Sequence, residues 1–517
     1  MKKFSRTEYS VFNIFASLFG YMINIILSFI CRIVFVHCLN AEYLGLNGMF
    51  SNILSLLSLT ELGIGTAMIY SLYKPISEND CDKICAYMRI YGIAYKVVGV
   101  IIGLVGLFLI PFLKILVGEA PSIPENIYLL YLLYLFSTAS SYFLSYKSSI
   151  IIANQRNYIV LAISYSLVIV QNLVQIIILI VFKNYILYLI AQVLFTLLTN
   201  IFISIKADKD YPYIKNKSAY KLSKIEKWTL IKNIKALTVT KLSGILVNNT
   251  DNIVITYFNG LIATGIVSNY SLITNMLTSL TNQIFNSLSA SLGNLNAKSD
   301  NEHKYTVFKS LNLINFWIYA WVTIGIIVLS NDIVGLFFGF DYVMKMEIPL
   351  ILGINFYMVG MLNVVSLYKS TMGLFKYGQY VLLFTAFFNL IGDIILGSKY
   401  GILGIFVATA IARALTNVWY EPYVIFKHGF KRKMNSYILR YFFYLTILII
   451  TGIITYILCS IVKISYVVGL LIKLLICIVV PNCIFVLIFH NFPEFKYIFS
   501  SVKGLLAKFN KMKKEII

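Results

Sequence analysis

Fourteen apolar stretches occupy nearly all of this 517-residue chain, and each is long enough to cross a lipid bilayer as a helix. A bilayer core about 30 Å thick takes roughly 20 apolar residues of helix. Hydrophobic residues make up 59% of the chain and charged residues only 12%, which leaves little room for a soluble domain. Because lipid offers no partner to a free backbone group, the sequence predicts an all-α polytopic membrane protein with fourteen transmembrane helices.

The predicted spans form two sets of six, followed by a pair. They are 11–35, 44–72, 91–113, 127–152, 160–182 and 186–205, then 236–258, 262–288, 308–329, 348–372, 380–396 and 402–425, and finally 437–461 and 466–489. Compared with itself, the chain matches best at the shift that pairs Asn13 with Asn233 and Gly45 with Gly265. This shift superposes the two sets and predicts two six-helix lobes related by a pseudo-twofold axis.

The predicted organisation therefore has four parts. They are an N-terminal lobe at 1–205, a basic linker at 206–235, a C-terminal lobe at 236–426, and two last helices with a basic tail at 427–517. Lys and Arg gather in the linker, in the tail and in every second loop, whereas the opposite loops carry only Lys114, Lys183, Lys345, Lys399 and Lys463. Since positively charged loops remain in the cytoplasm, both termini are expected there.

The net charge of +22 does not indicate a nucleic-acid-binding protein. The basic residues are spread over short loops rather than gathered on one folded module. The seven cysteines are mostly intramembrane and form no C-x-x-C pair, so neither a disulfide framework nor a zinc site is predicted. No metal and no cofactor are expected.

A small set of charged and polar side chains lies inside the predicted spans. Charges there cost at least a few kcal/mol and usually face the bundle interior or a water-filled cavity, so each is a candidate for function. The expected substrate-binding residues are Arg32, Lys147, Lys241, Lys369, Arg413, Asn24 and Asn248, and the expected ion-coupling residues are Glu61 and Asp251.

The basic residues of this set suit an anionic ligand. A guanidinium donates two parallel hydrogen bonds to a phosphate, while an ammonium acts as a mobile point charge. Arg32 and Arg413 are therefore the expected contacts of a phosphate or diphosphate. Two alternatives stay open: Arg32 could pair with Asp251 and Arg413 with Glu61 as clamps between helices, and the three lysines could extend to the membrane surface.

Several segments form a pattern that extends over nearly the whole chain. They are 13–32, 42–50, 61–67, 73–75, 210–213, 251–255, 373–376, 400–409 and 421–422. In these segments, for example Asp251-Asn-Ile-Val-Ile255, the chain resembles the Wzx-type polysaccharide repeat-unit flippases. This family belongs to the MOP superfamily, which also holds the MATE-type multidrug exporters and the lipid II flippases.

The resemblance implies two lobes around a central cationic cavity that work by alternating access in a bacterial cytoplasmic membrane. The implied cargo is an oligosaccharide on undecaprenyl diphosphate, carried from the inner to the outer leaflet for capsule, exopolysaccharide or O-antigen assembly. A proton or sodium gradient or the membrane potential would drive the cycle. Membrane lipids, a polysaccharide polymerase and assembly proteins are the implied partners, and the last two spans would form a groove for the prenyl tail.

Other functions agree less well with the sequence. Lipid II and teichoic acid precursors carry the same diphosphate and remain alternative cargoes. A MATE-type multidrug cation antiporter would more often have twelve spans and an acidic cavity. A membrane enzyme is not expected, because the external connections are short and the four histidines lie scattered, without paired carboxylates beside them.

Overall fold

The computed structural model describes residues 6–57, 64–113, 123–154, 156–215, 220, 222–288, 292, 295–296, 300–374, 377–378, 380–462 and 466–500. In this part of the chain the regular structure is helical and no strand occurs, which confirms the predicted all-α architecture. The helices form two compact units. Unit 1 comprises Met1–Ser268 with Asp393–Gly401, and unit 2 comprises Asn269–Gly392 with Ile402–Ile517. The lobe boundaries given above stay a prediction.

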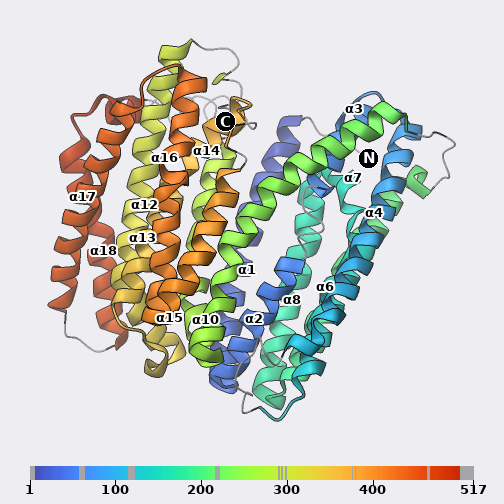
Figure 1. Cartoon of the computed structure of the whole chain (residues 1–517), viewed down its shortest axis with the longest axis horizontal. Coiled ribbons are helices and arrows are strands. Elements are labelled where there is room, and N and C mark those ends of the chain that lie inside the picture. The colour runs from blue at the N-terminus through green and yellow to red at the C-terminus, as the bar shows by residue number, and fades with distance from the viewer. Residues whose placement is uncertain are drawn as a thin grey trace, which may run out of the picture. The chain divides into compact units, whose positions relative to one another are not determined.

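Unit 1 is a bundle of long helices joined by short turns (Figure 1). Its elements are α1 (Arg6–Cys38), α2 (Ala41–Leu57), α3 (Ile64–Ser77), α4 (Cys81–Phe108), η2 (Ile110–Phe112), α6 (Ile127–Ser145), α7 (Ser148–Ala153), α8 (Asn157–Phe182), α9 (Tyr185–Asp210), η3 (Pro212–Lys215) and the first part of α10 (Lys224–Ser287). Helix α1 packs along α8, α8 along α9, and α6 lies against both α4 and α9.

Polar residues in the turns define where these helices begin. Asn126 accepts a hydrogen bond from the backbone N–H of Tyr128 at the start of α6, and Asn184 accepts one from Leu187 at the start of α9. Such side chains satisfy backbone donors that have no partner inside the helix. Between α8 and α9, Lys183 adopts a left-handed conformation with φ 47°, which allows the chain to reverse within two residues.

Unit 2 is organised around two buried helices. Its elements are the rest of α10, then α12 (Asn301–Phe338), η4 (Phe340–Tyr342), α13 (Glu347–Met361), α14 (Asn363–Thr371), most of α15 (Val381–Leu415), α16 (Asn417–Val424), the π-helix η5 (Ile425–Phe430), α17 (Asn435–Ser460) and α18 (Tyr466–Phe489). More than half of the apolar stretch is buried in α12 (56%) and in the run of α13 and α14 (61%), but only 17% in α18. Helices α12 and α13 are therefore central, and α18 is peripheral.

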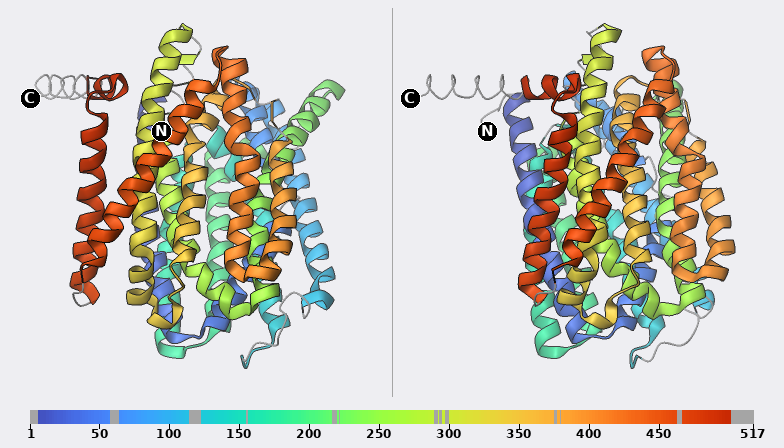
Figure 2. Two further views of the ribbon diagram at one scale, coloured as in Figure 1. Left: turned by 60° about the vertical axis from the view of Figure 1, so that its left-hand side comes forward. Right: turned by 90° about the vertical axis from the view of Figure 1, so that its left-hand side faces the viewer.

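The last two helices form a hairpin that packs along α12 (Figure 2). Stacked aromatic rings hold this contact together. The rings of Phe316 on α12 and Tyr444 on α17 stack with centroids 4.3 Å apart. Phe485 and Phe489 of α18 also pack against Phe316, with centroids 5.5 and 5.7 Å away.

Within the described residues, eleven helical runs are long and apolar enough to cross a membrane. They agree with the fourteen predicted spans. Two of the runs each contain two predicted spans, and the predicted span 44–72 is interrupted by residues 58–63, which lie outside the described part. The run of α10 reverses at Gly260 (φ 82°) and that of α15 at Gly401 (φ 58°). Glycine alone adopts such angles without strain, so each marks a turn between two spans. The chain is a multi-pass membrane protein.

A close contact inside unit 1 joins α2 to α10. A Cβ atom added to Gly45 would overlap the carbonyl group of Leu261, and one added to Gly265 would overlap the carbonyl group of Ala41. Small residues let the backbones of membrane helices approach closely. Both glycines are therefore required for the two helices to meet in this way.

Candidate functional site

Arg32 lies on α1 among hydroxyl groups of unit 1. Its guanidinium donates a hydrogen bond to Ser268 Oγ and interacts electrostatically with Tyr134, Tyr185 and Tyr188. The hydroxyl oxygens of Tyr134 and Tyr185 lie 3.0 Å apart, and the rings of Tyr185 and Tyr188 stack with centroids 6.0 Å apart. Hydroxyl groups accept hydrogen bonds without carrying a full negative charge, so these neighbours stabilise the cation by dipoles.

A ladder of polar side chains continues from Asn24 on the same helix. Asn24 Oδ1 accepts a hydrogen bond from Ser28 Oγ at 3.4 Å, and Ser28 Oγ accepts one from Asn172 Nδ2 of α8 at 3.4 Å. Gln175, one turn further along α8, donates to the carbonyl oxygen of Tyr188 at 3.2 Å. Asn172 and Gln175 are buried and were not among the expected site residues. Both side chains are amides within a strongly apolar span, and this is the sequence signal that could have identified them as site residues.

Asp251 of α10 shares a hydrogen bond with Asp393 of α15, and both belong to unit 1. Asp393 is fully buried, with 0% of its surface exposed. Two hydrogen-bonded carboxyl groups share one proton, and both can be ionised only when a cation lies between them. Sequence alone does not single out Asp393, because it lies near the end of a predicted span. The structure adds it to the predicted ion-coupling residue Asp251.

In unit 2, Arg413 has a neutral partner. Its Nη1 donates to Oδ1 of Asn355 on α13 at 3.0 Å. The amide nitrogen of Asn355 in turn donates to the carbonyl oxygen of Phe406 at 2.9 Å, which fixes the orientation of the amide. Lys369 of α14 instead forms an ion pair with Glu421 of α16, with its Nζ 2.8 Å from both carboxylate oxygens. This pair joins α14 to α16.

Other predicted site residues lie elsewhere or outside the described part. Lys147, between α6 and α7, pairs with Asp208 of α9 at 2.8 Å rather than with another predicted site residue of the described chain. Glu61 falls in 58–63, outside the described residues. The side chains of Lys241 and Asn248 on α10 also lie outside the described part.

Among the described residues, a sizeable cavity lies in each unit. The cavity of unit 1 has a volume of about 700 Å³ and is lined by several Lys and Arg side chains, including Lys147. The cavity of unit 2 has a volume of about 730 Å³ and lies between α12, α13, α16 and α17. Its walls are apolar and include Ile324, Met358, Trp419 and Leu445. A cavity of this kind suits hydrocarbon rather than a charged group.

Similarity to solved structures extends over nearly the whole chain. The lipid II flippase MurJ in an inward closed conformation superposes with a TM-score of 0.65 at 17% identity, covering 93% of this chain and 99% of the flippase. An inward-facing multidrug resistance MATE family transporter of the MOP superfamily has a TM-score of 0.58 at 14% identity and covers 78% and 96%. The chain has the fold of the MOP superfamily.

A second MATE structure with this MOP-superfamily fold, the VcmN transporter of Vibrio cholerae, has a TM-score of 0.58 at 13% identity and covers 82% of this chain and 99% of its own. The two MATE structures are thus covered over nearly their whole length, yet about a fifth of this chain has no counterpart in them. The part of this chain without a counterpart in the lipid II flippase is much smaller. No protein-family model and no curated protein matches the sequence.

Proposed function

We propose that this protein is a flippase that moves oligosaccharide repeat units linked to undecaprenyl diphosphate from the inner to the outer leaflet. The observation that carries the proposal is the apolar cavity of unit 2, bordered by α17. A volume of about 730 Å³ with apolar walls suits part of a prenyl tail, whereas a site for cationic drugs would carry acidic groups. The similarity to a lipid II flippase over 93% of the chain supports a lipid-linked cargo.

Arg32 and Arg413 are the proposed ligands of the diphosphate. The described hydrogen-bond acceptors of both guanidinium groups, Ser268 and Asn355, are neutral. These hydrogen bonds hold the guanidinium groups in position, and a guanidinium can donate two parallel hydrogen bonds to a phosphate. We propose that Asn24 and the residues Lys241 and Asn248 of α10 contribute further polar contacts to the cargo. Lys369 serves α14 and α16 through its pair with Glu421.

Alternating access requires an energy source. We propose that Asp251 and Asp393 bind the coupling ion, because their shared hydrogen bond needs a proton on one carboxyl group and a sodium ion could replace that proton between two carboxylates. Glu61 stays a second candidate. The membrane potential adds about 2.3 kcal/mol per charge per 100 mV. The proposed setting is a bacterial cytoplasmic membrane with both termini in the cytoplasm, beside a polysaccharide polymerase and assembly proteins.

The test compares cells that lack this protein with cells that receive it back as wild type, Arg413→Ala or Arg32→Ala. Lipid-linked repeat units should accumulate on the cytoplasmic leaflet without the protein, and the wild type should clear them. Each alanine variant should slow clearance about tenfold or more, since a hydrogen bond to a charged group contributes about 1.5 to 3 kcal/mol. Lysine at either position should restore only part of the rate, because the forked geometry is lost.

A matched control is Arg432→Ala, which removes an arginine that pairs with the exposed Glu302. This variant should clear the repeat units like the wild type. Membrane levels of every variant are compared by immunoblot. If Arg413→Ala and Arg32→Ala both clear at the rate of this control, the assignment of the diphosphate ligands is wrong.

The same cells distinguish the alternative cargoes. Lipid II or a teichoic acid precursor remains a candidate because a lipid II flippase has this fold. Accumulation of either lipid, in place of repeat units, would assign the cargo to it. The absence of any accumulated lipid, combined with greater sensitivity to cationic drugs, would instead assign the protein to the MATE-type exporters.

A further inference from the structure

The cavity of unit 1 lies at the end of the unit that carries the basic linker. The start of α4, the junction of α6 and α7, the end of α9 with η3, and the start of α10 form its walls. Its volume is about 700 Å³. Of the residues that the sequence predicts to bind the cargo or the coupling ion, Lys147 lines it, and there Lys147 pairs with Asp208.

The walls of this cavity carry a large excess of positive charge. Five cationic side chains line it, against the single carboxylate of Asp208; they are Arg89, Lys96, Lys147, Lys215 and Lys227. Asp208 pairs with Lys147 at 2.8 Å and with Lys215 at 3.4 Å. Within the described residues, Arg89, Lys96 and Lys227 form no ion pair. One carboxylate cannot neutralise five cations, so the cavity attracts an anion.

One face of α4 continues from this cavity along the helix. Arg89, Ile93 and Lys96 follow one another at helical spacing and are exposed. Val100 and Leu104 extend the same face with 50% and 63% of their surface exposed. The face is therefore basic where it meets the cavity and apolar further along. A ligand that matches both parts has an anionic head and a long hydrocarbon chain.

We infer that this cavity is a binding site for an anionic phospholipid of the surrounding bilayer, such as phosphatidylglycerol. The phosphate lies between Arg89 on α4 and Lys227 on α10, with Lys215 beside it, and an acyl chain lies along Ile93 and Val100. Basic pockets between membrane helices on the cytoplasmic side suit such headgroups. A soluble phosphate compound would match the cations but would leave the apolar face of α4 without a role.

The test is native mass spectrometry of the purified full-length protein, titrated with phosphatidylglycerol and, separately, with phosphatidylcholine. The wild type should retain phosphatidylglycerol in preference. The double variant Arg89→Gln/Lys227→Gln should bind it about thirtyfold more weakly, because each of the two cations contributes about 1 kcal/mol. The matched control Lys209→Gln/Lys433→Gln removes two exposed cations that do not line the cavity and should bind like the wild type.

Two further arms make the outcome unambiguous. Arg89→Lys/Lys227→Arg keeps both charges and should keep the lipid, which separates a charge effect from misfolding. Ile93→Ser should weaken phosphatidylglycerol without changing any binding of inorganic pyrophosphate. Equal retention by the double glutamine variant and its control would overturn the inference. Tighter binding of pyrophosphate or of undecaprenyl phosphate than of phosphatidylglycerol would overturn it too.

Discussion

Asp393 has no solvent exposure and shares a hydrogen bond with Asp251, which comes from a distant part of the chain. Arg32 and Arg413 differ from this pair, because their described hydrogen-bond partners are a hydroxyl and an amide. In unit 1 two acids therefore form a hydrogen bond with each other, whereas Arg32 donates to a hydroxyl group. At the scale of single residues, the acid pair is the proposed site of a cation and the arginines are the proposed contacts of an anion.

Replacing either carboxylate by its amide should abolish ion coupling. Asp393→Asn or Asp251→Asn removes the charge that holds the proton or sodium but keeps the shape of the side chain. Translocation should then lose its dependence on the ion gradient, measured in vesicles with and without an imposed gradient. The control is Asp341→Asn, an exposed residue of η4. Gradient dependence that survives in both variants would remove the pair from the mechanism.

Sequence identifies which residues of this site are costly in a membrane but not which of them meet. Arg32, Asp251, Lys369 and Arg413 are recognisable because a charge stands in an apolar run. Their partners come from other helices, and helix pairing depends on packing that no local pattern encodes. The hydroxyl groups around Arg32 could not be predicted either, because tyrosine is common throughout this chain and no local pattern marks the ones that meet.

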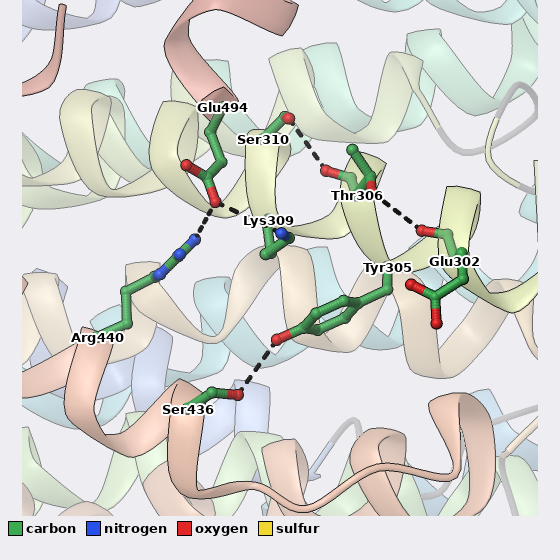
Figure 3. A network of polar contacts seen from close by, with 8 residues as sticks. All are labelled: Glu302, Tyr305, Thr306, Lys309, Ser310, Ser436, Arg440 and Glu494. Carbon is green, nitrogen blue, oxygen red and sulfur yellow. Dashed lines mark hydrogen bonds and ion pairs between the residues drawn. The ribbon is translucent and has the colours of Figure 1, made fainter. Parts of the chain in front are cut away.

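At the scale of elements, the segment that follows α18 is fastened to unit 2 by one buried carboxylate (Figure 3). Residues 493–500 are helical, and Glu494 is only 4% exposed. Glu494 Oε1 lies 2.8 Å from Nη1 of Arg440 on α17 and 3.8 Å from Nζ of Lys309 on α12. Three separate elements therefore meet at a single side chain.

This junction should depend on pH. Burial raises the pKa of Glu494, but a backbone hydrogen bond and the hydrogen bond and charge of Arg440, with the charge of Lys309, outweigh it and lower the pKa below its usual 4.5. The stabilisation is therefore complete above pH 4.5 and is lost as the pH falls through the lowered value. Hydrogen exchange at residues 493–500 should rise as acidification carries the pH through this lowered pKa.

Glu494→Gln should reproduce the effect at neutral pH, at a cost of about 2 kcal/mol, because it leaves Arg440 partly buried without its carboxylate. The comparison variant is Glu302→Gln, whose pair with Arg432 is exposed and should contribute less than about 1 kcal/mol. Equal exchange in the two variants at pH 7 would show that Glu494 does not fasten the segment.

Helix boundaries show where hydropathy stops being informative. The predicted span 437–461 agrees closely with α17 (Asn435–Ser460), since both ends lie where apolar residues end. The predicted span 308–329 is much shorter than α12 (Asn301–Phe338). Outside the bilayer a helix continues until a capping residue ends it, and Asp300 caps α12 through the backbone N–H of His303. The capping residue, rather than hydropathy, therefore determines where α12 begins.

At the scale of the molecule, the contact of α2 with α10 lies near the ends that the predicted topology assigns to the outer face. The glycines that meet there, Gly45 and Gly265, are the pair that the internal repeat relates to each other. In an alternating-access cycle, helices of the two predicted lobes that touch at the outer face must separate when the protein opens outward.

A disulfide across this contact should therefore stop transport. A Cβ atom on Gly48 would lie 3.9 Å from Cβ of Ser268, which is within the range for a disulfide between Gly48→Cys and Ser268→Cys. In a background without native cysteines, oxidation should block clearance of lipid-linked repeat units and reduction should restore it. The reduced double variant is its own control. Continued transport by the cross-linked protein would mean that this contact does not open.

The glycine contact of α2 and α10 also limits how the sequence can change. A single methyl group at Gly45 would overlap the carbonyl group of Leu261 and would destabilise the conformation in which α2 and α10 touch. The proposed conformation in which the two helices separate would not be affected. A penalty of about 1.4 kcal/mol changes the ratio of two states tenfold. Replacement of one hydrogen atom would thus alter the populations of the two conformations of the proposed cycle, at a position that is not among the proposed cargo ligands.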